Sequence, residues 1–339
     1  MSAPTTHPGA PGAAGPSGPF GGAAGPGGSS GGPGTPGGRA AIRWIVLVAA
    51  ALAVLVTAVF TLRGFVHDVR LKADSTRADL PANLTGLVID VPNAQVDVQT
   101  KPAAEAGATG TVVLSYQGVG TQVPTLEVVQ DGTVATFEVS GGPGDDWTWM
   151  FDRETELVVT VPEGTAKNVD LDVRAQTGTA EIEGEFRDVT INAASGAVDA
   201  DVVTRALTVD AETGYVHVEG RARTATVSTR TGAISVDTLD VAEKITLSSD
   251  RGFIEAELGD GALPAQGIEV TSDAGAVDLE VPRIADVANT GVRGYTVDAT
   301  SDNGAVNVEI ERLQIGTEEP HVPIVASSDS GAITVGYAR

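Results

Sequence analysis

The sequence contains no cysteine, few aromatic residues and far fewer positive than negative charges. Without cysteine the chain cannot form disulfides, thiolate zinc sites, iron–sulfur clusters or a cysteine nucleophile. Its 339 residues include 21 Lys and Arg against 45 Asp and Glu, a formal net charge of −24, which disfavours nucleic-acid binding. Aromatic residues make up 4% of the chain and hydrophobic residues 42%, so the core must be aliphatic.

The start of the chain lacks the composition of a folded segment. Residues 1–38 hold 14 Gly and 8 Pro, and no charged residue precedes Arg39. Such a segment cannot bury enough apolar surface to offset the entropy of ordering its backbone. We therefore expect residues 1–41 to form a disordered Gly/Pro-rich tail.

A single long hydrophobic run follows this tail. Residues 44–62 are uncharged and lie between Arg43 and Arg63. As a helix rising about 1.5 Å per residue they would span roughly 28 Å, close to the bilayer core of about 30 Å. The run is longer than the apolar core of a cleaved signal peptide. The sequence predicts a transmembrane helix over 42–65, with the lipid bilayer contacting 44–62, and a juxtamembrane stalk over 66–83.

The charges that flank this helix leave its orientation open. Two arginines precede it and four basic residues follow it by residue 77, a count that favours a cytoplasmic C-terminus. Three aspartates interleave with the second group, and long domains cross membranes largely regardless of such counts. Residues 80–339 carry 15 basic and 42 acidic residues, so the acidity belongs to the C-terminal part.

That C-terminal part is a repeat marked by glycines. The spacings between them are 18, 18, 18, 20, 23, 29 and 27 residues, and the glycines are Gly178, Gly196, Gly214, Gly232, Gly252, Gly275, Gly304 and Gly331. Aliphatic residues stand two and four positions after each glycine, with a polar residue between them. Aliphatic residues also stand seven and five positions before it, and a small residue three before. This alternation predicts a strand on each side of every glycine turn.

Two all-β architectures fit such units. In a β-solenoid each unit is one coil and like residues stack in parallel sheets about 4.8 Å apart. In an antiparallel meander the units are hairpins, and matched turns are not required. The fixed spacing of 18 favours the β-solenoid, with repeats over 166–339, N-terminal β coils and a cap over 84–165, and loops inserted at 259–267, 282–294 and 311–323.

The phrase LVVTVPEGTAKNVDLDVRAQTGTAEIEG at 157–184, followed by units such as S-G-A-V-D and T-G-A-I-S, resembles a bacterial β-strand-repeat family of unknown function whose members are called putative adhesins. The resemblance covers roughly 84–337. It implies a β-helical domain that is anchored to the cytoplasmic membrane and exposed outside it. It supplies no catalytic residues.

Four turns share the pattern Ser/Thr-Ser-Asp-x-Gly and place Asp250, Asp273, Asp302 and Asp329 along one edge of the repeat. Carboxylates stacked in this way could hold Ca²⁺, which prefers hard oxygen ligands. Aspartate two positions before glycine is also ordinary turn chemistry, in which the side chain accepts backbone hydrogen bonds. The calcium-binding nonapeptide is absent. Both interpretations stay open, and no other cofactor is indicated.

One aromatic cluster stands apart from the hydrophobic run. Trp147, Trp149 and Phe151 follow a flexible stretch that contains three glycines and a proline. They could bind sugar rings or a partner through stacking surface, or fold over the open end of the repeat as a plug.

No metalloprotease, phosphate-loop, nucleophile-elbow or dinucleotide motif occurs. The outward ladder of Asp199, His217, Ser235, Glu255, Asp278 and Asn307 is typical of a solvated sheet face. We therefore predict a membrane-anchored, extracytoplasmic display protein that is not an enzyme and that binds a cell-envelope or surface ligand. The alternatives are a structural or regulatory envelope protein coupled to another membrane protein, and a β-helix enzyme acting on polysaccharide.

Overall fold

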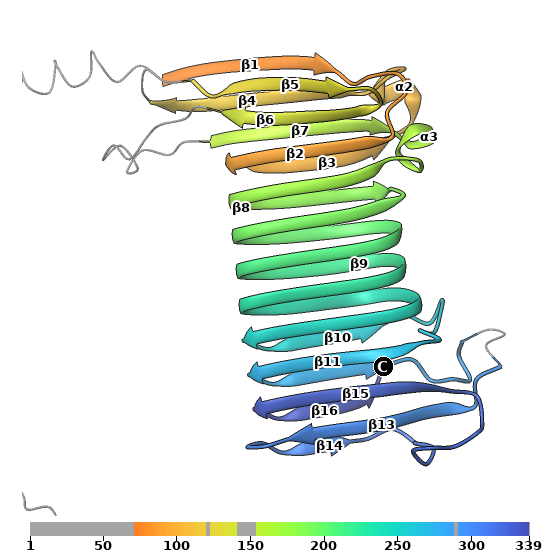
Figure 1. The fold of residues 1–339 in the computed structure, drawn as a ribbon. Helices are drawn as coiled ribbons and strands as arrows, with labels where there is room; N and C mark the ends of the chain where they lie inside the picture. Colours follow the sequence, from red (N-terminus) through yellow and green to blue (C-terminus); the bar gives the residue numbers. More distant parts are fainter. Residues whose placement is uncertain (1–70, 120–122, 141–153, 288–290, 339) are drawn as a thin grey trace, which may run out of the picture. The chain divides into compact units, whose positions relative to one another are not determined.

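A computed structural model describes residues 71–119, 123–140, 154–287 and 291–338. They form an almost entirely β structure (Figure 1), which confirms the predicted all-β class. The described residues contain two short helices, α2 (Ala103–Ala106) and α3 (Glu163–Ala166). The N-terminal strands are β1 (Leu71–Asp79), β2 (Gly86–Asn93), β3 (Gln95–Lys101), β4 (Thr111–Val119), β5 (Thr125–Asp131), β6 (Val134–Ser140) and β7 (Glu154–Pro162). The remaining strands are β8 (Asp170–Glu185), β9 (Asp188–Arg251), β10 (Ile254–Leu258), β11 (Gly267–Ala274), β12 (Val277–Val281), β13 (Gly294–Ser301), β14 (Val306–Val308), β15 (His321–Ser330) and β16 (Ile333–Tyr337).

Strands β2 and β3, together with every strand from β8 onward, wind into coils whose strands pair in parallel. β8 pairs with β9 so that Leu171 lies opposite Val189, Gly178 opposite Gly196 and Ile182 opposite Ala200. Each coil therefore has a first strand, a glycine turn and a second strand, and β9 winds through several coils without a break. Parallel, in-register pairing is the arrangement of a solenoid rather than a meander. The inward residues of both strands form one continuous core that is mainly aliphatic and also contains Phe137, Phe186 and Tyr295.

The glycine turns bring successive backbones into very close contact. A Cβ atom added to Gly196, Gly214 or Gly232 would lie 1.7 Å from the carbonyl oxygen of the preceding glycine in the column. These three residues also have φ values of 135°, 146° and 143°, which L side chains rarely adopt. At these three positions the close contact and the backbone angle each exclude every residue except glycine.

Antiparallel strands extend the N-terminal end of the stack. β2 and β3 form the first coil, and Ala94 occupies the position that glycine holds in later coils. β6 continues one sheet beside β2 and pairs with β5, while β7 continues the other beside β3 and pairs with β4. Residues 71–79, which the sequence analysis assigned to a stalk, form β1 on the edge of β4. Its residues from 74 to 77 are exposed, so β1 is held by backbone pairing and leaves little hydrophobic pattern to detect.

At the C-terminal end the spatial order of the coils departs from the order of the chain. β15 pairs with both β11 and β13, and β16 pairs with both β12 and β14. The last coil of the chain is thus inserted between the two coils that precede it. The glycine column follows the same order, because Gly331 lies against Gly275 and Gly304 against Gly331.

Within the described ranges no helix is long and apolar enough to cross a membrane. The predicted tail and the predicted transmembrane helix, residues 1–65, lie outside those ranges.

Candidate functional site

The outer face of the second strands carries most of the unusual chemistry of the stack. In six successive coils, the side chains three and five positions after each glycine point outward, and we call these twelve positions the acidic face. Ten of them are acidic, namely Glu181, Glu183, Asp199, Asp201, Glu219, Asp237, Glu255, Glu257, Asp278 and Glu280. The other two are His217 and Ser235, and all twelve are exposed or half-buried.

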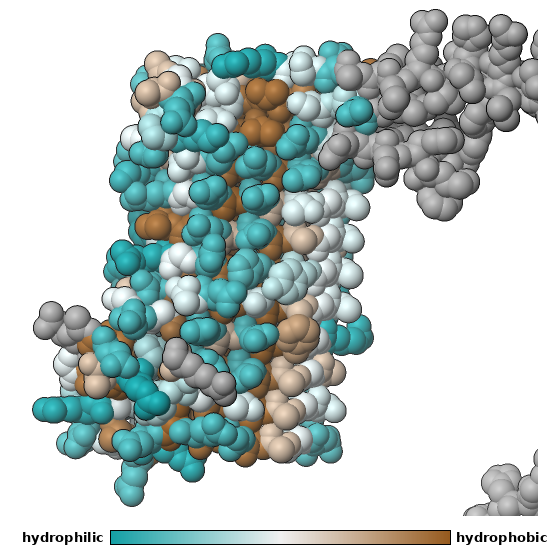
Figure 2. Space-filling view, turned by 180° about the vertical axis from the view of Figure 1, so that it is seen from behind, coloured by the Kyte–Doolittle hydropathy of each residue, from teal (hydrophilic) through white to brown (hydrophobic). Residues whose placement is uncertain are grey.

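Strand register aligns these side chains in two columns. Glu181 lies opposite Asp199 and Glu183 opposite Asp201, and further along Glu255 lies opposite Asp278. Neighbouring strands are about 4.8 Å apart, so adjacent carboxylates repel by on the order of 1 kcal/mol in water before salt screening. Figure 2 shows hydrophilic side chains along the length of the stack on one face. The aliphatic core must offset this repulsion.

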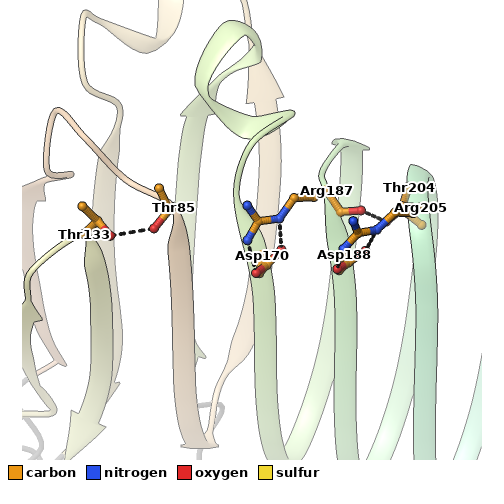
Figure 3. Close-up of polar contacts among 7 residues, drawn as sticks. All are labelled: Thr85, Thr133, Asp170, Arg187, Asp188, Thr204 and Arg205. Carbon is orange, nitrogen blue, oxygen red and sulfur yellow. Dashed lines mark hydrogen bonds and ion pairs between the residues drawn. The ribbon is translucent and has the colours of Figure 1, made fainter.

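The positive charges of the coils are engaged elsewhere. Arg187 forms a two-point ion pair with Asp170, and Arg205 forms one with Asp188, so these arginines tie successive coils together (Figure 3). Between residues 167 and 251, eight of nine Lys and Arg side chains form ion pairs, all with carboxylates outside the acidic face. Among the described residues none of the ten face carboxylates has a Lys or Arg partner.

A hydroxyl pair also joins neighbouring strands near the N-terminal end of the stack. The Oγ atoms of Thr85 and Thr133 lie 2.7 Å apart (Figure 3), and Thr204 donates from its Oγ1 to the carbonyl oxygen of Arg187 at 3.1 Å. These contacts, like the arginine pairs, connect residues that are far apart in the sequence. They stabilise the stack without using any side chain of the acidic face.

One carboxyl beside the acidic face has a raised pKa, partly because of its acidic neighbours. The pKa of Asp97, whose backbone pairs with Glu181, is raised above its ordinary value of 3.8. Partial burial is the largest cause, and the charges of Glu181, Glu156 and Glu183 add to it. Asp97 therefore continues the first column of the face into β3.

Two aromatic side chains border the acidic face beside the glycine column. Tyr215 and Phe253 each follow a column glycine directly, and their exposed fractions are 44% and 49%. Ala233 lies between them, because Gly232 contacts both Gly214 and Gly252, and the amide of Ile234 donates to the carbonyl oxygen of Phe253 at 3.1 Å. The ring of His217 lies parallel to that of Tyr215, with centroids 6.4 Å apart.

The four turn aspartates lie exposed along one edge, in the spatial order Asp250, Asp273, Asp329 and Asp302. Across the described part of the chain, no three His, Asp or Glu side chains are grouped so as to hold a metal ion. The four carboxylates also accept no hydrogen bond from any described residue. Instead, the turn serines bond the glycine column, with Ser272, Ser301 and Ser328 donating to Gly252, Gly331 and Gly275 at 3.2, 2.8 and 3.1 Å. Calcium binding here stays a prediction.

The predicted aromatic partner site, Trp147, Trp149 and Phe151, lies outside the described residues. Sequence reasoning found one column of the acidic face and interpreted it as solvated surface. It missed the second column, although Glu183, Asp201, Glu219 and Asp237 recur every 18 residues. It also missed Tyr215 and Phe253, whose shared position after glycine was a usable signal.

Residues 85–337 match the family described as Toastrack DUF4097. The chain belongs to the Toastrack family. This membership confirms the resemblance to the β-strand-repeat family that the sequence analysis stated. A comparison with curated proteins found no match.

Three solved structures are similar to the Toastrack protein at 11% sequence identity, and each alignment covers 79% of the Toastrack protein's chain. A putative adhesin from Parabacteroides merdae is covered over 97% of its own chain with a TM-score of 0.43, and one from Bacteroides fragilis over 97% with 0.37. A putative cell adhesion protein from Clostridium sporogenes is covered over 100% with a TM-score of 0.26.

Proposed function

We propose that this Toastrack protein is a membrane-anchored display protein whose β domain lies outside the cytoplasmic membrane and binds a macromolecular ligand without catalysis. The helix predicted over 42–65 anchors the chain in the lipid bilayer. The coils form a carrier that holds the acidic face toward a cell-envelope or surface partner.

The observation that carries this proposal is the uncompensated charge of the acidic face. Ten of its twelve side chains are carboxylates, while eight of the nine nearby cations pair with other acids. Such a surface weakens the fold through repulsion, so a binding role gives a physical reason for the arrangement. The names of the similar structures, which refer to adhesion, agree with this role.

The absence of cysteine permits a direct test of membrane placement. A single cysteine is introduced at exposed Ile315, and a second variant carries Ser2→Cys in the N-terminal tail. Intact cells are treated with a membrane-impermeant maleimide. We expect I315C to be labelled in intact cells and S2C to be labelled after lysis alone. The reverse pattern would place the β domain in the cytoplasm and end the display proposal.

A further inference from the structure

We infer that Tyr215 and Phe253 form an aromatic pair that binds the cationic side chains of a basic polypeptide lying on the acidic face. This inference rests on the proposed function and deepens it by naming the partner chemistry. It starts from two exposed aromatic rings in a sequence that has few aromatic residues.

The spacing of the coils suits a cation between the two rings. Tyr215 and Phe253 lie two coils apart, with only the small side chain of Ala233 between them. Two strand spacings separate their backbones by about 9.6 Å, so a group above the middle strand lies about 4.8 Å from each outer strand. Cation–π attraction acts within about 6 Å of a ring centroid.

The surroundings of the pair select for positive charge. Along the same three strands, the next outward positions are His217, Ser235 and Glu255, and the positions after those are all acidic: Glu219, Asp237 and Glu257. His217 has its Nδ1 atom 3.8 Å from Asp237, and none of the three carboxylates has a Lys or Arg partner among the described residues. A lysine or arginine that enters between the rings would therefore meet carboxylates on its far side.

An extended peptide can follow the second strands in this way. Its alternate side chains repeat about every 6.7 Å, as do the outward positions along each strand. One basic side chain can then lie between Tyr215 and Phe253 while the next reaches the carboxylates. A neutral sugar ring would use the aromatic surface and leave the carboxylate charge uncompensated, which makes it the weaker match.

The test measures peptide binding to the full-length protein in lipid nanodiscs by isothermal titration calorimetry. The probe is an eight-residue peptide of alternating arginine and serine, and its matched control replaces each arginine with neutral citrulline. The variants are Y215A/F253A and the ring-preserving exchange Y215F/F253Y. A third variant, V128A/V129A, removes exposed apolar side chains from β5, away from the face.

We expect Y215A/F253A to bind the arginine peptide about tenfold more weakly than the unaltered protein, whereas the other two variants keep their affinity. Thermal melting checks that each variant is folded. Three results would overturn the inference: equal affinity for the citrulline peptide, no loss in Y215A/F253A, or binding of a neutral tetrasaccharide such as chitotetraose in place of the peptide. None of them would alter the maleimide labelling, so the two proposals can fail separately.

Discussion

At the residue scale, the fold depends on a column of glycines whose backbones touch. A Cβ on Gly214 would lie 1.7 Å from the carbonyl oxygen of Gly196, and neither backbone can yield without disturbing several coils. Gly107 offers a comparison, because its φ is 81° but nothing lies within 4 Å of its added Cβ. Comparing alanine substitutions at the two positions therefore separates the energetic cost of steric overlap from that of backbone strain.

We therefore predict that Gly214→Ala lowers the free energy of unfolding by at least about 3 kcal/mol, while Gly107→Ala lowers it by about 1–2 kcal/mol. Urea denaturation followed by circular dichroism measures both values. Similar losses in the two variants would mean that close coil contact does not limit this column.

A second residue-scale prediction concerns the buried hydroxyls beside the turns. Ser272 donates to the carbonyl oxygen of Gly252 at 3.2 Å, whereas the equally buried Ser249 has no hydrogen-bond partner among the described residues. Removing a buried hydroxyl that donates a hydrogen bond lowers the free energy of unfolding by about 1 kcal/mol. Removing a buried hydroxyl without a partner leaves the free energy of unfolding unchanged or raises it. Ser272→Ala should thus lower the urea midpoint and Ser249→Ala should leave it unchanged or raise it. The opposite ranking would contradict the assigned bonds.

At the scale of elements, the inserted last coil connects the C-terminal strands β13 and β14 to the rest of the stack. β13 and β14 pair with β15 and β16 and with no other described strand, apart from an isolated bridge between Tyr295 and Arg312. They therefore cannot join the stack until the end of the chain has docked on β11 and β12. Order in the chain and order of assembly differ here.

This arrangement predicts an asymmetry between two deletions. Truncation after Thr317 removes β15 and β16, and residues 294–308 should lose their amide hydrogen-exchange protection because their partners are gone. Deleting 286–316 instead removes β13 and β14 and leaves a connection of eight residues, as long as 259–266. Residues 321–337 should then stay protected. Protection of 294–308 in the truncated chain would contradict the observed coil order.

At the scale of the whole molecule, the repeat made much of the fold predictable. The two-strand coil, the aliphatic columns and the positions of the inserted loops all follow from residue classes that recur at fixed distances from glycine. The spatial order of the last two coils could not be predicted from the sequence. The units at Gly304 and Gly331 share one turn pattern, and the long connections allow either order. Edge strand β1 was missed because backbone pairing, which has no side-chain signature, holds it.

The acidic face was half predictable for a related reason. Its first column was identified from the alternation after each glycine, but carboxylates on an outer strand face look like ordinary solvated surface. Whether these carboxylates differ from ordinary surface depends on whether cations pair with them. The ion pairs join residues in different coils, such as Arg205 with Asp188. Sequence spacing alone cannot show which acids are left unpaired.

The raised pKa of Asp97, which partial burial causes first and the neighbouring carboxylates second, predicts a dependence of stability on pH. The raised pKa of Asp97 means that the folded state binds its proton more tightly than the unfolded chain, so stability falls as pH rises from below 3.8 through the folded-state pKa. Asp97→Asn should therefore raise the Tm at pH 7 and leave it unchanged at pH 3. The exposed-loop variant Glu318→Gln should change neither value. An equal gain for Asp97→Asn at both pH values would show that the charge of Asp97 is not what lowers the stability of the fold.

The central claim is that the acidic face is the binding surface, and one comparison of matched charge variants tests it most directly. In the first variant Asp199, Asp201, Glu255 and Glu257 become the corresponding amides; in the second the same change is made at Asp131, Asp260, Glu105 and Glu318, exposed acids elsewhere. Both variants have the same net charge. In 150 mM salt, where long-range attraction is screened, we expect the first to bind the arginine–serine peptide at least about tenfold more weakly than the second. Equal affinity would show that total charge, rather than this face, determines binding.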